Sequence, residues 1–303
     1  MTQGTQRIVI QCLVLAAILT STARANTLYV SNSGDNTVVK LTPPSGTITP
    51  FASTDTPYGL AFDPSGNLFV VNSVTSGSVS KVTPSGTVSV FATGFNNASG
   101  ITFDSSGNLY VANYYGNHQV SKVTPSGSVT LNFTSGFQTP YGLAFNNGSL
   151  YVTDYGANTL SKVDPNTGVS SLFASISSPT GIAFDQSGNL YVSSGSNDEV
   201  YKVTADGTVT PFASVTSAPY GLAFDSSGNL FVALFRADEV SEFNSSGQLV
   251  SNYTGFHGPI FLAIEPSAVP EPSSMMLIGL GAAGLIGYRW RCRKQPDKAN
   301  PLF

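Results

Sequence analysis

The sequence is poor in charge and has almost no cysteine. Charged residues make up 10 % of its 303 residues, and apolar residues make up 41 %. This balance favours a chain that buries a core and excludes an intrinsically disordered protein. The two cysteines, Cys12 and Cys292, lie near the two ends of the chain, with none between them. The central part therefore works without disulfides, which is compatible with export to an oxidising compartment.

Basic residues are scarce in the central part. Residues 26–272 contain six cations against sixteen carboxylates, a net charge of −10. Such a surface repels phosphate backbones, which excludes nucleic acid as a partner. Five of the cations recur at corresponding positions, which predicts a solvated strand position: Lys40, Lys81, Lys122, Lys162 and Lys202.

Motifs for catalysis are missing as well. The sequence has no Gly-x-Ser-x-Gly elbow, no metal-spaced histidine cluster and no phosphate loop. Its two histidines are His118 and His257, and no glutamate precedes Glu199. We therefore expect no catalytic residue, no metal site and no cofactor. A paired-carboxylate site stays open as an alternative, in loops expected to be exposed: Asp198 with Glu199, and Asp238 with Glu239.

The N-terminal segment has the order of a secretory signal. One positive charge within residues 1–7 precedes an apolar run at 8–19 and the small-x-small site Ala23-Arg24-Ala25. This order predicts a signal peptide over residues 1–25, cleaved after Ala25. A first core helix or an uncleaved anchor is the alternative, and Cys12 lies inside the run, which disfavours a lipoprotein.

A second apolar stretch, residues 273–288, lies near the C-terminus between two short motifs. Before it stand Pro270, Glu271 and Pro272, and after it Arg289, Arg291 and Arg293. Cations beyond an apolar helix hold that end in the cytoplasm, which leaves the central part outside. A helix over 273–288 would be about 24 Å long, short for a bilayer, which predicts a temporary transmembrane anchor.

Pro-Glu-Pro, a glycine-rich apolar helix and an arginine cluster, in this order, resemble the PEP-CTERM sorting signal of Gram-negative and related bacteria. The resemblance predicts a sorting tail over residues 268–303. It implies recognition by an exosortase-type processing enzyme, removal of the helix near Pro-Glu-Pro, and release to the cell surface or an exopolysaccharide matrix. An ordinary C-terminal membrane anchor is the alternative.

The central part is a tandem repeat. YGLAFDPSGNLFV begins at Tyr58, and related segments begin at Ser99, Tyr141, Thr180 and Tyr220. Each is followed by a second block of the type VSKVTPSGTVSVFA. A repeat thus contains four strand-length runs rich in β-branched and aromatic residues, separated by Asp-x-Ser-Gly-Asn and Thr-Pro-Ser-Gly turns. Consecutive apolar residues within the runs indicate that both sheet faces are buried.

The ends of the array predict how it closes. NTLYV at residue 26 is a second strand without a first, and PIFLAI at residue 259 is a first strand without a second. We therefore expect an all-β fold over residues 26–267: a six-bladed β-propeller of four-stranded antiparallel blades, in which the C-terminal inner strand completes the N-terminal blade.

The Gly-Leu/Ile-Ala-Phe-Asp-x-x-Gly-Asn-Leu-Tyr-Val core resembles the NHL repeat, and more broadly the propellers of the gluconolactonase and streptogramin lyase families. The resemblance covers residues 26–266 and specifies architecture rather than chemistry. Gluconolactonase-like enzymes hold a divalent metal with a Glu, an Asn ahead of an inner strand and an Asp after a second strand, and here only Asp154 matches by position. Streptogramin-lyase-like enzymes use a Glu and histidines close together, an arrangement that His118 and His257 do not match.

Candidate ligand-binding residues gather at one end of the disc, around the mouth of the central channel. Aromatic rings stack on sugar faces, and amides and hydroxyls bind sugar hydroxyls, so we expect a glycan or another small polar ligand there. The alternative is that the tyrosines pack between blades and that the Asn and Asp side chains order loops. The candidates are Tyr58, Tyr141 and Tyr220 just ahead of inner strands, Asn72, Asn113 and Asp154 just after second strands, and Tyr155, His118 and Arg236 nearby.

The sequence therefore predicts an exported cell-surface or matrix propeller of a Gram-negative-type bacterium that acts as a binding or scaffolding module. Extracellular polysaccharide is an expected partner, and the membrane is a partner through the C-terminal helix before processing. A lactonase- or lyase-type enzyme and a purely structural matrix protein are the two alternatives.

Overall fold

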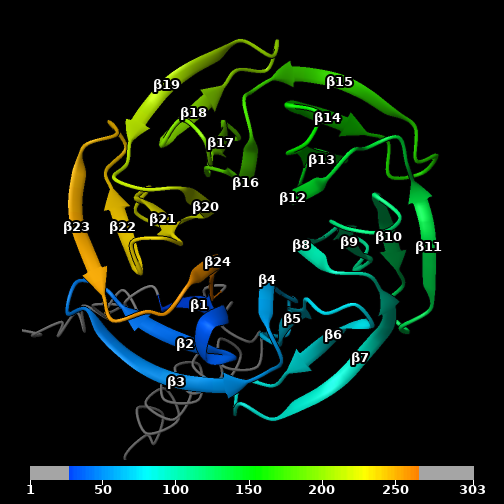
Figure 1. Cartoon of the computed structure of the whole chain (residues 1–303), viewed down its shortest axis with the longest axis horizontal. Coiled ribbons are helices and arrows are strands. Elements are labelled where there is room, and N and C mark those ends of the chain that lie inside the picture. The colour runs from blue at the N-terminus through cyan, green and yellow to red at the C-terminus, as the bar shows by residue number, and fades with distance from the viewer. Residues whose placement is uncertain (1–26, 266–303) are drawn as a thin grey trace, which may run out of the picture. The chain divides into compact units, whose positions relative to one another are not determined.

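The computed structural model describes residues 27–265, which form six four-stranded antiparallel sheets arranged as blades around an axis (Figure 1). From the axis outward, blade 1 is β24 (Pro259–Ile264), β1 (Leu28–Asn32), β2 (Thr37–Thr42) and β3 (Thr47–Ser53), and blade 2 is β4 (Pro57–Phe62), β5 (Leu68–Asn72), β6 (Gly77–Val82) and β7 (Val88–Phe95). Blade 3 is β8 (Ala98–Phe103), β9 (Leu109–Asn113), β10 (Gln119–Val123) and β11 (Val129–Thr134), and blade 4 is β12 (Pro140–Asn146), β13 (Ser149–Asp154), β14 (Thr159–Val163) and β15 (Ser170–Ser175). Blade 5 is β16 (Pro179–Phe184), β17 (Leu190–Ser194), β18 (Glu199–Val203) and β19 (Val209–Ser214), and blade 6 is β20 (Pro219–Phe224), β21 (Leu230–Leu234), β22 (Glu239–Phe243) and β23 (Leu249–Thr254). The expected six-bladed, all-β fold is confirmed.

The Asp-x-Ser-Gly-Asn segments form the tight turns between first and second strands. In blade 2, Asp63 Oδ1 accepts hydrogen bonds from the backbone N–H groups of Ser65 and Asn67, at 2.9 and 2.8 Å. Gly66 adopts φ = 79°, a left-handed conformation that glycine reaches without a steric penalty. Each residue type of this motif therefore has a role in reversing the chain.

Both faces of each blade are buried against a neighbouring blade. All five residues of the second strand β5 are buried, which explains its run of apolar residues without alternation. One apolar cluster lies between each pair of neighbouring blades, and the cluster that joins blades 6 and 1 contains Phe231 and Leu28. Burial of these faces around a closed ring is what stabilises the fold.

The recurring lysines differ from the expectation of a purely solvated position. Each ammonium lies over an aromatic ring of the second strand in its own blade, at 5.1 to 5.8 Å from the ring centroid. Lys40 also lies 4.4 Å from the ring centroid of Phe51. The lysine stems and charges thus cover aromatic rings through cation–π contacts. In blade 6 the corresponding residue is Glu242, whose Oε2 accepts a 2.6 Å hydrogen bond from the Tyr253 hydroxyl.

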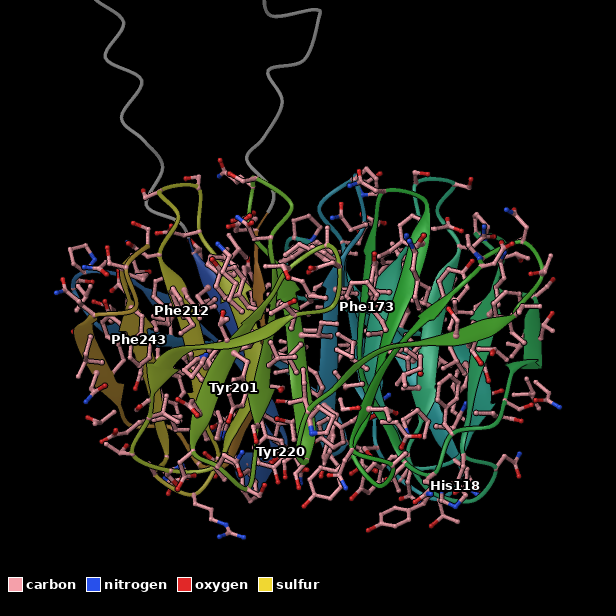
Figure 2. All side chains as sticks on the ribbon, turned by 90° about the horizontal axis from the view of Figure 1, so that it is seen from above. His118, Phe173, Tyr201, Phe212, Tyr220 and Phe243 are labelled. Carbon is pink, nitrogen blue, oxygen red and sulfur yellow. The ribbon has the colours of Figure 1, made fainter. Side chains whose placement is uncertain are left out.

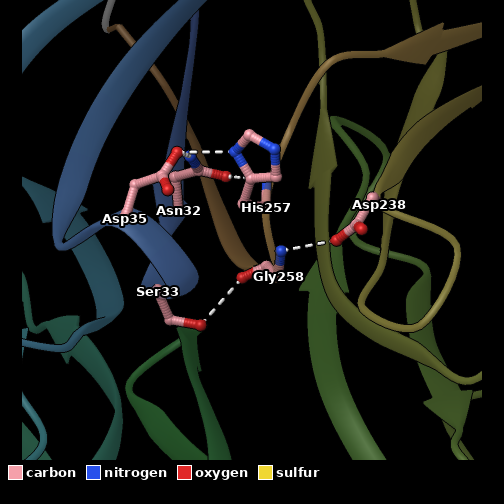
Figure 3. Close-up of polar contacts among 6 residues, drawn as sticks. All are labelled: Asn32, Ser33, Asp35, Asp238, His257 and Gly258. Carbon is pink, nitrogen blue, oxygen red and sulfur yellow. Dashed lines mark hydrogen bonds and ion pairs between the residues drawn. The ribbon is translucent and has the colours of Figure 1, made fainter.

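Blade 1 is completed by strands from the two ends of the array, as the sequence predicts. β24 pairs with β1, with Leu28 opposite Ile264 and Val30 opposite Leu262. Residues 255–258, which we call the closing loop, connect β23 to β24. Figure 3 shows how this loop is bound on both sides: His257 N–H donates to Asn32 Oδ1 in blade 1, and Gly258 N–H donates to Asp238 Oδ1 in blade 6, each at 2.6 Å.

Neighbouring inner strands approach each other so closely that a side chain does not fit between them. A Cβ atom added at Gly181 in β16 would overlap the carbonyl oxygen of Tyr220 in β20. The Ser193 hydroxyl bridges the same two strands: it accepts from Gly181 N–H at 2.7 Å and donates to the Tyr220 carbonyl at 2.6 Å. A glycine and a serine hydroxyl group therefore set the distance between the inner strands of blades 5 and 6.

The expected signal peptide, its cleavage site at Ala23 and Ala25, and the sorting tail with its apolar helix lie outside the described residues. The strands run from Leu28 to Ile264, within the predicted limits of 26 and 267. Across residues 27–265, no helix is long and apolar enough to cross a membrane.

Candidate functional site

The candidate site lies at one end of the central channel. Tyr58, Tyr141 and Tyr220 are the second residues of the inner strands β4, β12 and β20, so they belong to the strands rather than preceding them as expected. Figure 2 shows Tyr220 and His118 at the same end of the disc. The pseudo-symmetry of the ring brings the three tyrosines to this end, because nearly equivalent positions of neighbouring inner strands lie side by side, as Gly181 and Tyr220 do.

These tyrosines line a cavity of about 280 Å³. We call it the tyrosine mouth, and its lining residues are Tyr58, Ser73, Asn97, Tyr114, Tyr115, Tyr141, Tyr220, Phe235 and Ile260. The volume is near the lower end of the range for small-molecule pockets. The lining combines aromatic faces with hydroxyl and amide groups and contains no carboxylate and no cation.

Tyr141 forms the centre of an aromatic network in the mouth. Its ring centroid lies 5.3 Å from that of Tyr114 at an interplanar angle of 88°, and 5.6 Å from that of Tyr220. On another side the Tyr141 ring stacks on Phe261 of β24, with centroids 5.7 Å apart. Tyr220 contacts Phe235 in turn, at 5.4 Å. Edge-to-face and offset contacts of this kind hold the rings in fixed positions before any ligand arrives.

The phenols of the mouth stay protonated well above neutral pH. Burial raises the pKa of Tyr58, Tyr141 and Tyr220, and repulsion from neighbouring phenols raises it further. Burial also raises the pKa of Tyr114, helped by the hydroxyl of Tyr115. The positive charge of Arg236 acts in the opposite direction on Tyr220. The mouth therefore presents neutral hydroxyl groups that can donate and accept hydrogen bonds.

Asn72 and Asn113 are the last residues of β5 and β9, and both are buried. The Asn72 amide donates to Ser80 Oγ at 2.8 Å, and the Asn113 amide donates to Ser121 Oγ at 2.9 Å. Asn113 Oδ1 also accepts from the backbone N–H of Asn96 at 3.3 Å. These contacts order the strand ends and loops, and neither side chain lines the mouth.

Asp154 ends β13 and uses its carboxylate in the same way. Its Oδ2 accepts from Gln138 N–H and its Oδ1 from Thr139 N–H, both at 2.7 Å, and the side chain is 2 % exposed. Both oxygens are thus committed to the loop before β12. The divalent metal of gluconolactonase-like propellers does not fit these residues, because Asp154 is occupied by backbone donors and tyrosines hold the position of the asparagine ligand. In residues 27–265 no group of three His, Cys, Asp or Glu side chains could hold a metal ion.

Exposed aromatic side chains stand around the mouth. Tyr115 is 53 % exposed, Tyr155 38 % and Phe235 36 %. All three lie in loops between second and third strands, and Tyr155 stands just outside the lining of the cavity. Arg236 follows Phe235 in the same loop and is exposed. Tyr155 and Arg236 therefore lie in loops between second and third strands and outside the lining of the mouth, and their contact with a ligand stays a prediction.

The two histidines lie on separate loops. His118, between β9 and β10, has φ = 49° and a buried Nδ1 without a hydrogen-bond partner. His257 lies in the closing loop, where its Nδ1 is 2.6 Å from Asp35 Oδ2. Among the described contacts, no hydrogen bond or ion pair joins either histidine to a glutamate. Neither histidine lines the mouth.

The carboxylate pairs of blades 5 and 6 also lie away from the mouth lining. Asp198 and Asp238 are exposed, while Glu199 and Glu239 are the first residues of β18 and β22 and half-buried. The expectation of an exposed loop therefore holds for the two aspartates but not for the two glutamates.

Some residues that line the mouth were not identified as candidates from the sequence. Ser73, Asn97 and Ile260 line the cavity although each is unremarkable in the repeat pattern. Ser73 occupies the loop position that Tyr114 occupies in the next blade, so aligning the blades could have found it. Asn97 could not be found in this way, because it directly precedes an inner strand at a position where the residue type differs between blades, as Thr56 and Ser178 show.

Comparison with protein families gives two matches. A model described as the virginiamycin B lyase family matches residues 12–243. A model of the PEP-CTERM protein-sorting motif matches residues 268–294, which confirms the resemblance of the tail and indicates an exported protein. No curated protein matches the sequence.

Solved structures show the same fold at low sequence identity. A chain of a nidogen/laminin complex is 14 % identical with a TM-score of 0.72, over 80 % of this chain and 100 % of that chain. A gluconolactonase from Xanthomonas campestris is 20 % identical with a TM-score of 0.60, over 68 % and 78 %. A catalytically inactive histidine-to-alanine variant of virginiamycin B lyase from Staphylococcus aureus, with quinupristin, is 16 % identical with a TM-score of 0.59, over 80 % and 94 %.

Proposed function

This chain belongs to the virginiamycin B lyase family, and we propose that it is an exported binding module whose ligand is an uncharged sugar held in the tyrosine mouth. The proposal gives the propeller a role in the surface or matrix to which its sorting motif directs it. The binding residues are Tyr58, Tyr141 and Tyr220, with Tyr114 and Phe235 completing the aromatic walls.

The composition of the mouth carries the proposal. Its rings offer flat apolar faces, and the phenols, Ser73 and Asn97 offer neutral hydrogen-bonding groups. Sugars present C–H faces and hydroxyl groups in a matching way, so aromatic stacking and hydroxyl hydrogen bonds act together. An uncharged ligand also suits a surface of strong negative charge, since residues 26–272 carry a net charge of −10.

The lyase and lactonase chemistry of relatives finds less support in this chain. Inactivation of the Staphylococcus aureus lyase by a histidine-to-alanine change assigns a histidine to that enzyme's activity. Here His257 is paired with Asp35 in the closing loop, and no histidine lines the mouth. General acid–base catalysis requires such a group within hydrogen-bond reach of the ligand. We therefore place this chain among the binding modules rather than the enzymes.

The ends of the chain complete the proposal. A signal peptide over residues 1–25 starts export, and an exosortase-type enzyme processes the tail at residues 268–303, whose helix over residues 273–288 anchors the protein in the membrane until then. The partner after processing is extracellular polysaccharide. A role without any ligand, as a structural component of the matrix, is the outcome if the mouth binds nothing.

Isothermal titration of the purified protein with neutral oligosaccharides, uronic acids and lactones tests the proposal. Tyr58→Ser gives blade 2 the residue that blade 3 has at Ser99, and we expect it to abolish the binding of neutral sugars. Tyr201→Ser is the matched control, because four other blades carry serine at that position of their third strand: Ser80, Ser121, Ser161 and Ser241.

Two results contradict the proposal. Binding that needs a divalent metal and disappears in Asp154→Ala assigns the site to a metal-dependent enzyme. An absence of heat with every neutral sugar, in a protein with a normal melting temperature, assigns the chain to a structural role.

A further inference from the structure

The rim of the tyrosine mouth is uneven, although its six loops correspond. The residue after the second strand makes the same backbone hydrogen bond in successive blades: Ser73 N–H to Thr56 C=O (2.9 Å), Tyr114 N–H to Asn97 C=O (3.2 Å), Tyr155 N–H to Thr139 C=O (3.0 Å) and Gly195 N–H to Ser178 C=O (3.0 Å). Ser33 of blade 1 bonds in the same way to Gly258 C=O (3.1 Å), and Phe235 follows the second strand of blade 6. One backbone position therefore carries tyrosine in blades 3 and 4, phenylalanine in blade 6, and a small residue in blades 1, 2 and 5.

The small residues leave two gaps on opposite sides of the rim. Blades 2 and 5 lie across the axis from each other in Figure 1. At the gap in blade 5, the inner-strand residue Thr180 is also small and only 1 % exposed, and both Thr180 and Gly195 lie outside the lining of the cavity. At the gap in blade 2, Ser73 lines the mouth, and the neighbouring rim residue of blade 1, Ser33, is small too.

Aromatic walls stand between the two gaps. On one side are Tyr114, Tyr115 and Tyr155 of blades 3 and 4, and on the other side is Phe235 of blade 6. We call the path between these walls, open at Ser73 and Gly195, the mouth groove. Its floor is formed by Tyr58, Tyr141 and Tyr220.

The wall residues are exposed but held in place. Tyr115 is 53 % exposed, yet its ring centroid lies 4.2 Å from that of Tyr114 at 81°. Phe235 is 36 % exposed and contacts Tyr220. Aromatic rings that are exposed and already positioned bind a flat partner with little loss of side-chain entropy.

We infer that the mouth groove binds an internal segment of a linear neutral polysaccharide rather than a single sugar or a chain end. This inference rests on the proposed function and adds the length and direction of the ligand. The cavity of about 280 Å³ holds only a small part of such a chain. The neighbouring sugar units leave through the gaps at Ser73 and Gly195 and stack on the walls, which include Tyr155, 38 % exposed and outside the lining of the cavity.

Titration of the whole protein with linear β-1,4-glucan and β-1,4-mannan oligosaccharides of one to six units tests the inference. We expect affinity to rise about ten-fold from the disaccharide to the hexasaccharide, because stacking on the walls adds to binding in the cavity. Reduction of the chain end to the alditol should leave hexasaccharide affinity unchanged.

Two variants act on the groove outside the cavity. Gly195→Tyr fills one gap with the residue that blades 3 and 4 carry at the same position, and a Cβ there meets only the Thr180 methyl group, at 3.3 Å, within 3.4 Å. Tyr155→Ala removes one ring of a wall. Gly195→Tyr should lower the ratio of hexasaccharide to disaccharide affinity to near one, and Tyr155→Ala should lower it in part, whereas Ser187→Tyr, in an exposed turn between β16 and β17 at the other end of the disc, should leave this ratio as it is.

The outcomes separate the two proposals. Neutral sugars could bind with an affinity that does not increase with length, or reduction of the chain end could abolish binding. Either result contradicts the inference of a groove and leaves the proposed sugar-binding function in place. If no oligosaccharide of any length binds to protein with a normal melting temperature, the proposed function fails and the groove fails with it.

Discussion

His257 Nδ1 lies 2.6 Å from Asp35 Oδ2 (Figure 3). This contact joins the closing loop to the short 3-10 helix η1 (Ser33–Asp35), which follows β1. The two residues are 222 positions apart in the sequence. The hydrogen bond to Asp35 and the attraction of its charge raise the pKa of His257 above 6.5, with a smaller effect from Asp238. The contact that closes the ring therefore depends on pH.

Stability should decrease as the pH rises past neutrality. A histidine with a raised pKa in the folded state stabilises the protein fully below its unfolded pKa of 6.5, and this stabilisation is lost as the pH rises through the folded pKa. Melting temperatures between about pH 5.5 and 8.5 should fall with pH in the native protein and stay flatter in His257→Gln. Asp35→Asn should reproduce the flatter profile. Equal slopes in all three proteins contradict the prediction.

Gly181→Ala should destabilise the propeller by about 1–3 kcal/mol, because the added methyl group overlaps the Tyr220 carbonyl oxygen in the next blade. Chemical denaturation measures the free energy of unfolding. Gly195→Ala is the matched control, since its Cβ meets a methyl group at 3.3 Å instead of a backbone oxygen. A loss of stability that is no larger for Gly181 than for Gly195 shows that the inner strands can move apart.

Glu242→Ala should cost about 2 kcal/mol, because it leaves the Tyr253 hydroxyl without its acceptor and removes one of the two acceptors of the Asn229 amide, the other being Asp225. In the native protein burial raises the pKa of Tyr253 to about 12, with a further contribution from its hydrogen bond to Glu242. A double-mutant cycle with Tyr253→Phe measures the coupling. Strictly additive losses contradict the predicted interaction.

Lys40→Gln should destabilise the protein by about 0.5–1 kcal/mol through loss of cation–π contact with Tyr29 and Phe51. Lys162→Gln should have a smaller effect, because Lys162 is exposed and lies 5.8 Å from the centroid of one ring. The comparison uses denaturation at constant ionic strength. Equal changes in the free energy of unfolding for the two variants would indicate that the lysines serve solubility instead of stability.

Alkaline titration should divide the tyrosines into two groups. Burial raises the pKa of Tyr58, Tyr141 and Tyr220 above the ordinary tyrosine value of about 10, so these phenols stay protonated to higher pH. A raised tyrosine pKa stabilises the fold below pH 10, and this stabilisation is lost as the pH rises further. Absorbance at 295 nm should show a late phase that accompanies unfolding. Tyr141→Phe should reduce the amplitude of the late phase, and a single phase in the native protein contradicts the prediction.

The fold could be predicted almost completely because it is encoded many times. The turn glycine represented by Gly66 recurs in every complete repeat and the aspartate represented by Asp63 in all of them but one, and the unpaired half-blades at Leu28 and Ile264 predict the closure. The surroundings of the lysines could not be predicted. A lysine on a sheet surface has the same sequence pattern whether it points to water or lies over a ring of the neighbouring strand, as Lys40 does over Tyr29.

The site could be predicted in part. The tyrosines of the inner strands were identifiable from the repeat, and the structure brings Tyr58, Tyr141 and Tyr220 into one cavity. Asn72 and Asp154 stand at the same end of the disc, but their side chains bond to Ser80 and to loop amides. A short polar residue at a strand end can face inward or outward with equal ease. Only the three-dimensional contacts therefore distinguish a ligand-binding residue from a residue that orders a loop.

The pairing of Leu28 with Ile264 also has a mechanical consequence. The two ends of the propeller leave from the same end of one antiparallel ladder, so tension between them opens the hydrogen bonds of β1 and β24 one at a time instead of shearing them together. The other five blades carry no load until this ladder has opened. We expect blade 1 to release first and at low force when the ends are pulled in optical tweezers, and a single high-force rupture would contradict this. Under tension the propeller would thus open between β1 and β24 while most of its blades stay intact.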